Sequence, residues 1–507
     1  MTQGSTRDLG KSIATGAVWL VLLSFSIKSI SIVSTLIIAR LLIPEDFGVY
    51  ALSMSIFSFV ELIRAFGFGM ALIQNKNAER DHYDTAWTLH FVFSFVAALA
   101  LYILSEPISH WVNEPRTLDV IKFLTWIFIF DAFTNIGVID FQKNMLFNKE
   151  FVRQILIKLS GFVVTIPLVF ILRSYWALLY GTLATTLVSV FLSYAMHPFR
   201  PKFSLKKSRE MIHFSAWLQL NNVLRYADKN LENFIVSRFA GAGNVGLLAM
   251  SKEVSSLPNV ELVESINRAA YPAFAKVSGE STGTRNAFLS VYSSIAAVSL
   301  PVGGGIAIIA PWLVPLLLGD KWVETVPLIQ VLSMAYMLSA LNSSASYIFL
   351  AAAMQNYNVY LTLLKLLFFV PIMLLLIPVY GAIGAAFSIF LTSRVMFPIT
   401  AYVMAKFIGL SAKDLFDSVL RPVSAMLLMV KIVLVSASHI QGVGIERESP
   451  MGLLLLVTVG VLVYILTLTL LWLLQSKPEG PESNTLRVLQ KHVVLPAWLS
   501  PMASSNE

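Results

Sequence analysis

The feature that most restricts the fold of this chain is a set of long apolar segments without charged residues. One of them, Leu453–Leu474, reads LLLLVTVGVLVYILTLTLLWLL. A helix needs about 20 such residues to cross the hydrocarbon core of a bilayer. Only 13% of the 507 residues are charged and the mean hydropathy is +0.73, whereas soluble proteins carry about 25% charged residues. The chain is therefore predicted to be an all-α integral membrane protein. A transmembrane β-barrel would show short alternating segments instead.

The apolar segments predict fourteen transmembrane helices. They cover residues 12–40, 47–73, 84–105, 117–138, 151–172, 175–197, 211–238, 245–275, 286–310, 325–353, 358–378, 381–405, 418–438 and 451–474. An even number places both termini on one side. The loops on the opposite side hold few basic residues, namely Arg40, Arg116, Arg173, Arg238, Lys321 and Arg447. Because cytoplasmic loops are enriched in Lys and Arg, both termini are predicted to be cytoplasmic.

Charge and motifs narrow the class of function. The net charge of +8 is explained by basic cytoplasmic loops, so no nucleic-acid partner is expected. The chain has no cysteine, which excludes disulfides and cysteine-based metal sites. No nucleotide-binding, metal-ligand or nucleophile motif is present. We therefore expect no cofactor, no metal and no enzymatic activity; transport would draw on an ion gradient or on the gradient of the substrate.

One phrase occurs twice in the sequence. IIARLLIPEDFGVYALSM (Ile37–Met54) and IVSRFAGAGNVGLLAMSK (Ile235–Lys252) align with Gly48 over Gly246, an offset of 246 − 48 = 198 residues. Both copies lie where the first helix of a group of six passes into the second. A fainter match pairs Lys158 with Lys365. The repeat predicts two parallel six-helix bundles, 1–200 and 201–410, related by an axis along the membrane normal. Helices 13 and 14 (411–475) and a cytoplasmic tail (476–507) follow.

Three segments carry a family resemblance: ARLLIPEDFG, VELIRAFGFGMALIQNKN and RPKFSLKKSREMIHFSAWLQLNNVLRYADKNLENFIVSRFAGAGNVGLLAM. They resemble the polysaccharide transporter (Wzx-type oligosaccharide flippase) family of the multidrug/oligosaccharidyl-lipid/polysaccharide (MOP) superfamily. The resemblance extends to about residue 410. It implies a V-shaped pair of bundles around a central cavity. It also implies export of undecaprenyl-pyrophosphate-linked oligosaccharide across the bacterial cytoplasmic (inner) membrane, for O-antigen, capsule or exopolysaccharide. Membrane lipids, glycosyltransferases and a polysaccharide polymerase are the expected partners.

Basic residues inside the predicted helices suggest where such a substrate binds. A charge at the bilayer centre costs at least about 2.5–3.5 kcal/mol, and Lys and Arg are the donors that hold phosphate. We predict a cationic cavity formed by Lys28, Arg64, Arg225, Lys229, Arg268 and Arg394. By resemblance, lipid II flippases use arginines on helices 1, 2 and 8, where this chain has Lys28, Arg64 and Arg268; the lysine departs from that pattern.

The predicted seventh helix carries a charged stripe. Arg225, Asp228, Lys229 and Glu232 are spaced i, i+3, i+4 and i+7, which places them on one face. Asp228 and Glu232 are candidates for a coupling site for H⁺ or Na⁺. The alternative is that the stripe neutralises itself, with Asp228 as a simple partner of Arg225.

Two other functions compete with oligosaccharide export. A cation-coupled multidrug exporter of the same superfamily would favour an acidic cavity, against the cationic surplus. A membrane glycosyltransferase or polymerase would need catalytic acids in an outer loop, and Glu45–Asp46 is such a pair. Enzymes of that kind bring sizeable outer loops, which this chain lacks. The two acids also suit a helix N-terminus, whose positive dipole end attracts them.

Overall fold

The computed structural model describes residues 3–64, 67–442, 446–475, 480 and 482–483, and every transmembrane-length element in these ranges is a helix. The chain divides into two compact units, unit 1 (Met1–Gly246) and unit 2 (Leu247–Glu507). Apart from residues 480, 482 and 483, the predicted cytoplasmic tail lies outside the described residues. The division into functional bundles at residue 200 stays a prediction.

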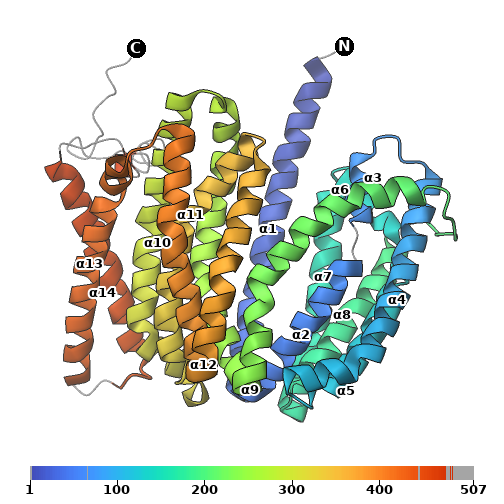
Figure 1. Cartoon of the computed structure of the whole chain (residues 1–507), viewed down its shortest axis with the longest axis horizontal. Helices are drawn as coiled ribbons and strands as arrows, with labels where there is room; N and C mark the ends of the chain where they lie inside the picture. Colours follow the sequence, from blue (N-terminus) through green and yellow to red (C-terminus); the bar gives the residue numbers. More distant parts are fainter. Residues whose placement is uncertain (1–2, 65–66, 443–445, 476–479, 481, 484–507) are drawn as a thin grey trace. The chain divides into compact units, whose positions relative to one another are not determined.

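Unit 1 is a bundle of long helices with short elements at one end (Figure 1). Helix α1 packs on α7, which packs on α8, while α2, α4 and α5 contact one another and α5 reaches α8. Its elements are α1 (Gln3–Leu41), α2 (Pro44–Arg64), α3 (Phe68–Gln74), α4 (Arg80–Val112), α5 (Thr117–Asp131), η1 (Ile136–Ile139), α6 (Asp140–Lys143), α7 (Phe147–Leu172), α8 (Trp176–Ala195) and the first part of α9 (Ser208–Val277).

Unit 2 begins inside α9 and continues with α10 (Ser281–Leu317), η2 (Asp320–Trp322), α11 (Thr325–Ala351), α12 (Gln355–Ile408), α13 (Ala412–Gly442) and α14 (Pro450–Leu474). Its main core contains Phe274, Phe288, Ile295 and Phe349. The last two helices pack on α10, where Tyr464 of α14 donates a hydrogen bond of 2.8 Å to the carbonyl of Ala297.

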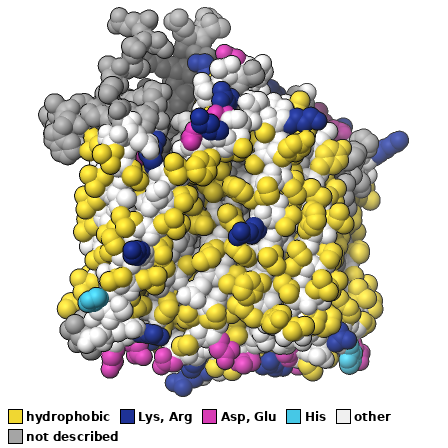
Figure 2. Space-filling view, turned by 60° about the vertical axis from the view of Figure 1, so that its left-hand side comes forward, with side chains coloured by type: hydrophobic (Ala, Val, Ile, Leu, Met, Phe, Trp, Pro, Cys, Tyr) yellow, Lys and Arg dark blue, Asp and Glu magenta, His cyan; other side chains and the backbone are white. Residues whose placement is uncertain are grey.

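Eleven described helices are long and apolar enough to cross a membrane, or twelve if one bent pair counts as a span. Their apolar side chains face outward, because lipid rather than water is the surrounding solvent. Over the face shown in Figure 2, hydrophobic side chains cover a broad band, and acidic and basic side chains gather above and below it. The prediction of an all-helical membrane protein is confirmed at this level.

Two of the predicted helices are broken, so their prediction as continuous spans was wrong. The segment predicted as one helix over 47–73 ends as α2 at Arg64, and α3 begins at Phe68. The segment predicted over 117–138 ends as α5 at Asp131, and the chain bends by 78° before η1 and α6. Asn135 holds this second turn: its buried side chain donates to the carbonyl of Phe199 at 2.7 Å and accepts from the backbone N–H of Gly137 at 2.9 Å.

Two other helices pass through a single non-helical residue. Helix α9 changes direction at Gly241 (φ 82°, ψ 171°), and α12 at Gly381 (φ 59°, ψ −134°). Both backbone conformations have positive φ, which a residue with a Cβ adopts only at a steric cost. The sequence predicts a helix boundary near each point, between 238 and 245 and between 378 and 381. The chain changes direction at the two glycines.

The two glycines of the repeated phrase touch each other. A methyl group on Gly48 of α2 would overlap the carbonyl of Ala242, and one on Gly246 of α9 would overlap the carbonyl of Pro44. Because 242 − 44 and 246 − 48 are both 198, the contact is reciprocal under the repeat. Each copy of the phrase therefore supplies a helix start and a glycine that lets the other copy approach at backbone distance.

We expect Gly48→Ala and Gly246→Ala each to lower the melting temperature of the purified protein in detergent, measured by intrinsic fluorescence. The added methyl group would clash with backbone, which cannot move aside as a flexible side chain can. The loss of stability should therefore reach about 3 kcal/mol, the upper end of the range typical of overpacking. Gly305→Ala in α10 is the matched control, because the nearest atom to its new methyl group is 4.0 Å away. Equal melting temperatures for the Gly48 variant and the control would contradict the close contact between Gly48 of α2 and Gly246 of α9.

Candidate functional site

Arg64 is the deepest of the predicted cations, and it is held by polar groups from two other helices. Its side chain is 5% exposed and forms a short ion pair with Asp131. It donates to Ser94 Oγ at 2.9 Å, and its Nη1 lies 3.4 Å from His90 Nε2. Glu61, one turn earlier, is 3.7 Å away and half exposed. These contacts join the ends of α2 and α5 to the middle of α4.

Asp131 and His90 were not singled out from the sequence as site residues. His90 looks like one of seven scattered histidines, and Asp131 is a lone acid in the apolar run IFIFDAF. The only signal was that each places a polar group deep in an apolar helix. The contact itself joins residues 67 positions apart, which no local pattern reveals.

The charged stripe of α9 does not have one uniform environment. Arg225 and Lys229 are exposed, Asp228 is half-buried, and Glu232 is 2% exposed. Neighbouring residues fix this part of α9 to α2: Tyr226 donates to the carbonyl of Ser55, and Asn233 donates to Ser55 Oγ at 2.9 Å.

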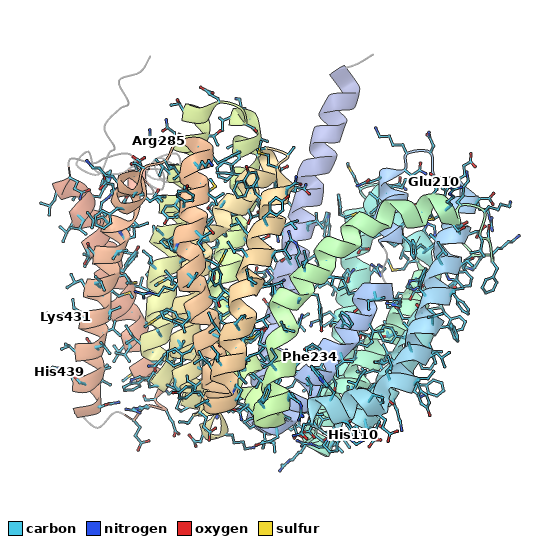
Figure 3. All side chains as sticks on the ribbon, viewed as in Figure 1. His110, Glu210, Phe234, Arg285, Lys431 and His439 are labelled. Carbon is cyan, nitrogen blue, oxygen red and sulfur yellow. The ribbon has the colours of Figure 1, made fainter. Side chains whose placement is uncertain are left out.

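Further along α9, Phe234 stacks near Trp111 with ring centroids 6.2 Å apart (Figure 3). The first arm of α9 is thus anchored on one side while its two basic side chains stay accessible.

The remaining predicted cations belong to other helices. Lys28 is half-buried on α1 of unit 1. In unit 2, Arg268 is 71% exposed and its Nε lies 3.2 Å from Glu264, which also accepts a hydrogen bond of 2.8 Å from Tyr347. Arg394 on α12 is exposed and has no ion-pair partner within the described ranges. Their predicted convergence on one cavity stays a prediction.

Unit 2 also contains an apolar groove of about 490 Å³ between the second arm of α12 and the start of α13. It is lined by Tyr292, Phe397, Pro398, Ala401, Tyr402, Ala405, Ala412, Leu415, Phe416 and Val419. No lining residue is charged, so the groove can accept a hydrocarbon chain but not a phosphate. Basic and acidic side chains lie at the same end of unit 2, where Arg285, labelled in Figure 3, pairs with Asp414 at 2.8 Å.

Metal binding finds no support among the described side chains, which contain no group of three or more His, Asp or Glu residues able to hold an ion. What the described geometry can do is chemically simple. The exposed guanidinium and ammonium groups can bind anions, the groove can bind an acyl or prenyl chain, and the Arg64 cluster contains groups that exchange protons.

Comparison with known proteins assigns the family. Residues 37–327, more than half of the chain, match the family model described as "Polysaccharide biosynthesis protein", and the chain belongs to this family. It is 25% identical over 407 residues to the lipopolysaccharide biosynthesis protein WzxC of Escherichia coli strain K12, covering 79% of this chain and 82% of WzxC.

Solved structures show the fold. The lipid II flippase MurJ, in an inward closed conformation, is similar with a TM-score of 0.73 at 12% identity, covering 90% of this chain and 99% of MurJ. An inward-facing multidrug resistance MATE family transporter of the MOP superfamily follows with a TM-score of 0.61 at 14% identity, covering 76% of this chain and 96% of the transporter. The predicted family membership is confirmed by the family model and by the similarity to WzxC, and the two solved structures show a similar fold.

We expect Arg64→Ala and Arg268→Ala to differ sharply in stability. Removing Arg64 leaves the partly buried Asp131 carboxylate without its main partner, and the cost should approach the roughly 3–5 kcal/mol typical of breaking a fully buried pair. Arg268 is mostly exposed, so its loss should cost less than about 1 kcal/mol. Melting curves of the two purified variants beside the wild type measure the difference. Similar small shifts for both would mean that the Arg64–Asp131 pair contributes little to stability.

Proposed function

We propose that this protein is a flippase that moves undecaprenyl-pyrophosphate-linked oligosaccharide across the bacterial cytoplasmic membrane, by alternating access, for O-antigen, capsule or exopolysaccharide synthesis. The family, the lipopolysaccharide role in the name of WzxC and the fold of a lipid II flippase support this proposal. It makes the chain a transporter and not an enzyme.

One observation carries the proposal: exposed cations on α9 and α12, the two helices that the proposed topology divides into membrane spans. Arg225, Lys229 and Arg268 are exposed on α9, and Arg394 is exposed on α12. Exposure to hydrocarbon would cost each at least about 2.5–3.5 kcal/mol. An aqueous surface that receives a diphosphate removes this cost, because the charges are then hydrated in the free protein and paired with phosphate oxygens in the complex. We propose Lys28 and Arg64 as further members, with Asp228 and Glu232 as candidates for ion coupling.

The lipid part of the substrate needs a different surface. The uncharged groove between α12 and α13 offers aromatic and aliphatic side chains and suits a prenyl chain that remains in the membrane while the sugar crosses. Membrane phospholipids would occupy it when substrate is absent. Glycosyltransferases that build the oligosaccharide and a polymerase that consumes it are the expected functional partners.

The rival functions fit less well. A multidrug exporter has a similar fold, but cationic drugs would be repelled by the exposed Lys and Arg side chains. A glycosyltransferase would use Glu45 and Asp46. Both lie in the first turn of α2, where the helix dipole stabilises them without any catalytic role.

We propose fourteen spans with both termini in the cytoplasm. The bent pair of α5 with η1 and α6 counts as one span, and the breaks at Gly241 and Gly381 divide α9 and α12 into arms of more than about 20 residues each, long enough for separate spans.

Cysteine labelling tests this topology in intact cells, since the chain has no cysteine of its own. Glu446→Cys should react with a membrane-impermeant maleimide from outside. Lys76→Cys should react only after the inner membrane is permeabilised; both positions are exposed. The reverse pattern, or labelling of both from one side, would contradict the proposed orientation.

Export itself is tested by recovery of surface polysaccharide from cells that lack the chromosomal gene and carry a variant. Arg225→Ala combined with Lys229→Ala, and Arg268→Ala alone, should each reduce the polysaccharide at least tenfold with unchanged protein in the membrane, since each removes phosphate-binding charge. Lys431→Ala is the control, because Lys431 is an exposed cation on α13 (Figure 3) outside the proposed set. Normal export by both test variants would remove the basis of the proposal.

A further inference from the structure

The Arg64 cluster lies where two helices of unit 1 stop. Arg64 is the last residue of α2 and Asp131 the last residue of α5, and their side chains pair directly with each other. In membrane transporters, irregular backbone at membrane depth is tolerated where it serves a binding site, and ion sites commonly form at discontinuous helices. Two interruptions meeting at one ion pair therefore mark this position as more than a packing contact.

The charges of the cluster do not balance. The charged and titratable groups that meet there are Glu61 and Arg64 from α2, His90 from α4 and Asp131 from α5. Two carboxylates and one guanidinium leave a net charge of −1 when His90 is neutral. One added proton, on His90 or on the half-exposed Glu61, brings the sum to zero, which is the favourable state for the buried part of such a cluster.

His90 lies where it can take this proton. Its Nε2 is 3.4 Å from Arg64 Nη1, 3.5 Å from Asp131 Oδ2 and 3.2 Å from the carbonyl oxygen of Asp131. An unprotonated Nε2 can accept from the Arg64 guanidinium. A protonated Nε2 can only donate, and its acceptors are the two oxygens of Asp131. The same nitrogen therefore has a partner in either protonation state, and the two states favour different neighbours.

We propose that His90 is a proton-binding group through which unit 1 couples transport to a proton gradient, in addition to the candidates Asp228 and Glu232, with Asp131 and Arg64 as its positioning residues. The inference rests on the proposed export function. In the neutral tautomer that carries its hydrogen on Nδ1, proton uptake turns Nε2 from an acceptor for Arg64 into a donor to Asp131, so it alters the link that joins the end of α2 to the end of α5. The bound species is a proton and not a metal cation, because Arg64 already occupies Asp131 and a proton needs only one lone pair.

Proton binding is measured directly on the full-length protein in lipid nanodiscs. Histidine labelled with ¹⁵N gives one set of ring signals for each imidazole, and His90→Gln identifies the set that belongs to His90. We expect the His90 signals to show both the neutral and the protonated form over the pH range in which the protein stays folded. An imidazole that keeps one form throughout that range would overturn the proposal, whatever the substrate of the transporter.

Coupling is measured as surface polysaccharide in cells with and without nigericin, which removes the pH gradient. Wild-type export should fall about tenfold on nigericin treatment, whereas His90→Gln should export at the low level under both conditions. Glutamine retains one donor and one acceptor, so its melting temperature should stay close to that of the wild type. His110→Gln is the control: His110 is on the same helix, 81% exposed, and paired only with Glu106 at 3.9 Å.

The outcomes separate this inference from the proposed function. Proton coupling at His90 is overturned if wild-type export is the same with and without nigericin. It is also overturned if His90→Gln remains as sensitive to nigericin as the wild type. In both cases the proposed flippase function stands. Dependence on a sodium gradient instead would assign the coupling to another ion and would also overturn it. If His90 binds a proton but the control His110→Gln loses export as His90→Gln does, the loss is not specific to His90. The proton site would then stand, and its role in coupling would be overturned.

Discussion

The free-energy cost of a charge in hydrocarbon is the constraint on which the rest of this structure depends. Each charged side chain at the bilayer centre costs at least about 2.5–3.5 kcal/mol, so a helical membrane protein keeps such a residue only where a partner or water receives it. The chain uses both solutions. Arg64 is 5% exposed and is enclosed by Asp131, Ser94 and His90, whereas Arg225 and Lys229 remain exposed on α9. Enclosed charges organise unit 1, and accessible ones are available to a ligand.

The same constraint explains why α2 and α5 break together. A helix end leaves backbone carbonyls without intrahelical partners, which is costly within a membrane unless polar groups lie nearby. At the end of α5, His90 Nε2 lies 3.2 Å from the backbone carbonyl oxygen of Asp131, while Arg64 and Thr134 donate to the Asp131 carboxylate. Polar side chains are therefore present where α5 ends.

The sequence predicted much of this architecture but not the cluster. Apolar runs such as Leu453–Leu474 located the helices because lipid imposes composition directly. The boundary predicted between 378 and 381 lies next to Gly381, where the structure has a positive φ. The breaks before Phe68 and after Asp131 were missed because long apolar runs lie on both sides of each. Which acid meets which base depends on how α2, α4 and α5 pack, and hydropathy carries no information about that.

The sequence also could not predict which individual charged residues are buried. Arg225, Asp228, Lys229 and Glu232 share a helix face by spacing, yet Glu232 is buried while Lys229 is exposed. The helical spacing predicts which face of the helix a side chain is on, but its exposure depends on which helix packs against that face. Here α2 packs nearby, and its Ser55 accepts hydrogen bonds from Tyr226 and Asn233.

The repeated phrase was the clearest sequence signal, and its physical basis is the contact between its two copies. Pro44 and Gly48 of the first copy meet Ala242 and Gly246 of the second, each glycine against the carbonyl that opens the other helix. Such a reciprocal contact constrains both copies together, because a side chain added to either glycine meets the backbone of the other copy. The close approach of α2 and α9 therefore uses both copies of the phrase, because each copy supplies the backbone against which the glycine of the other packs. The shared phrase therefore reflects a packing requirement of the fold.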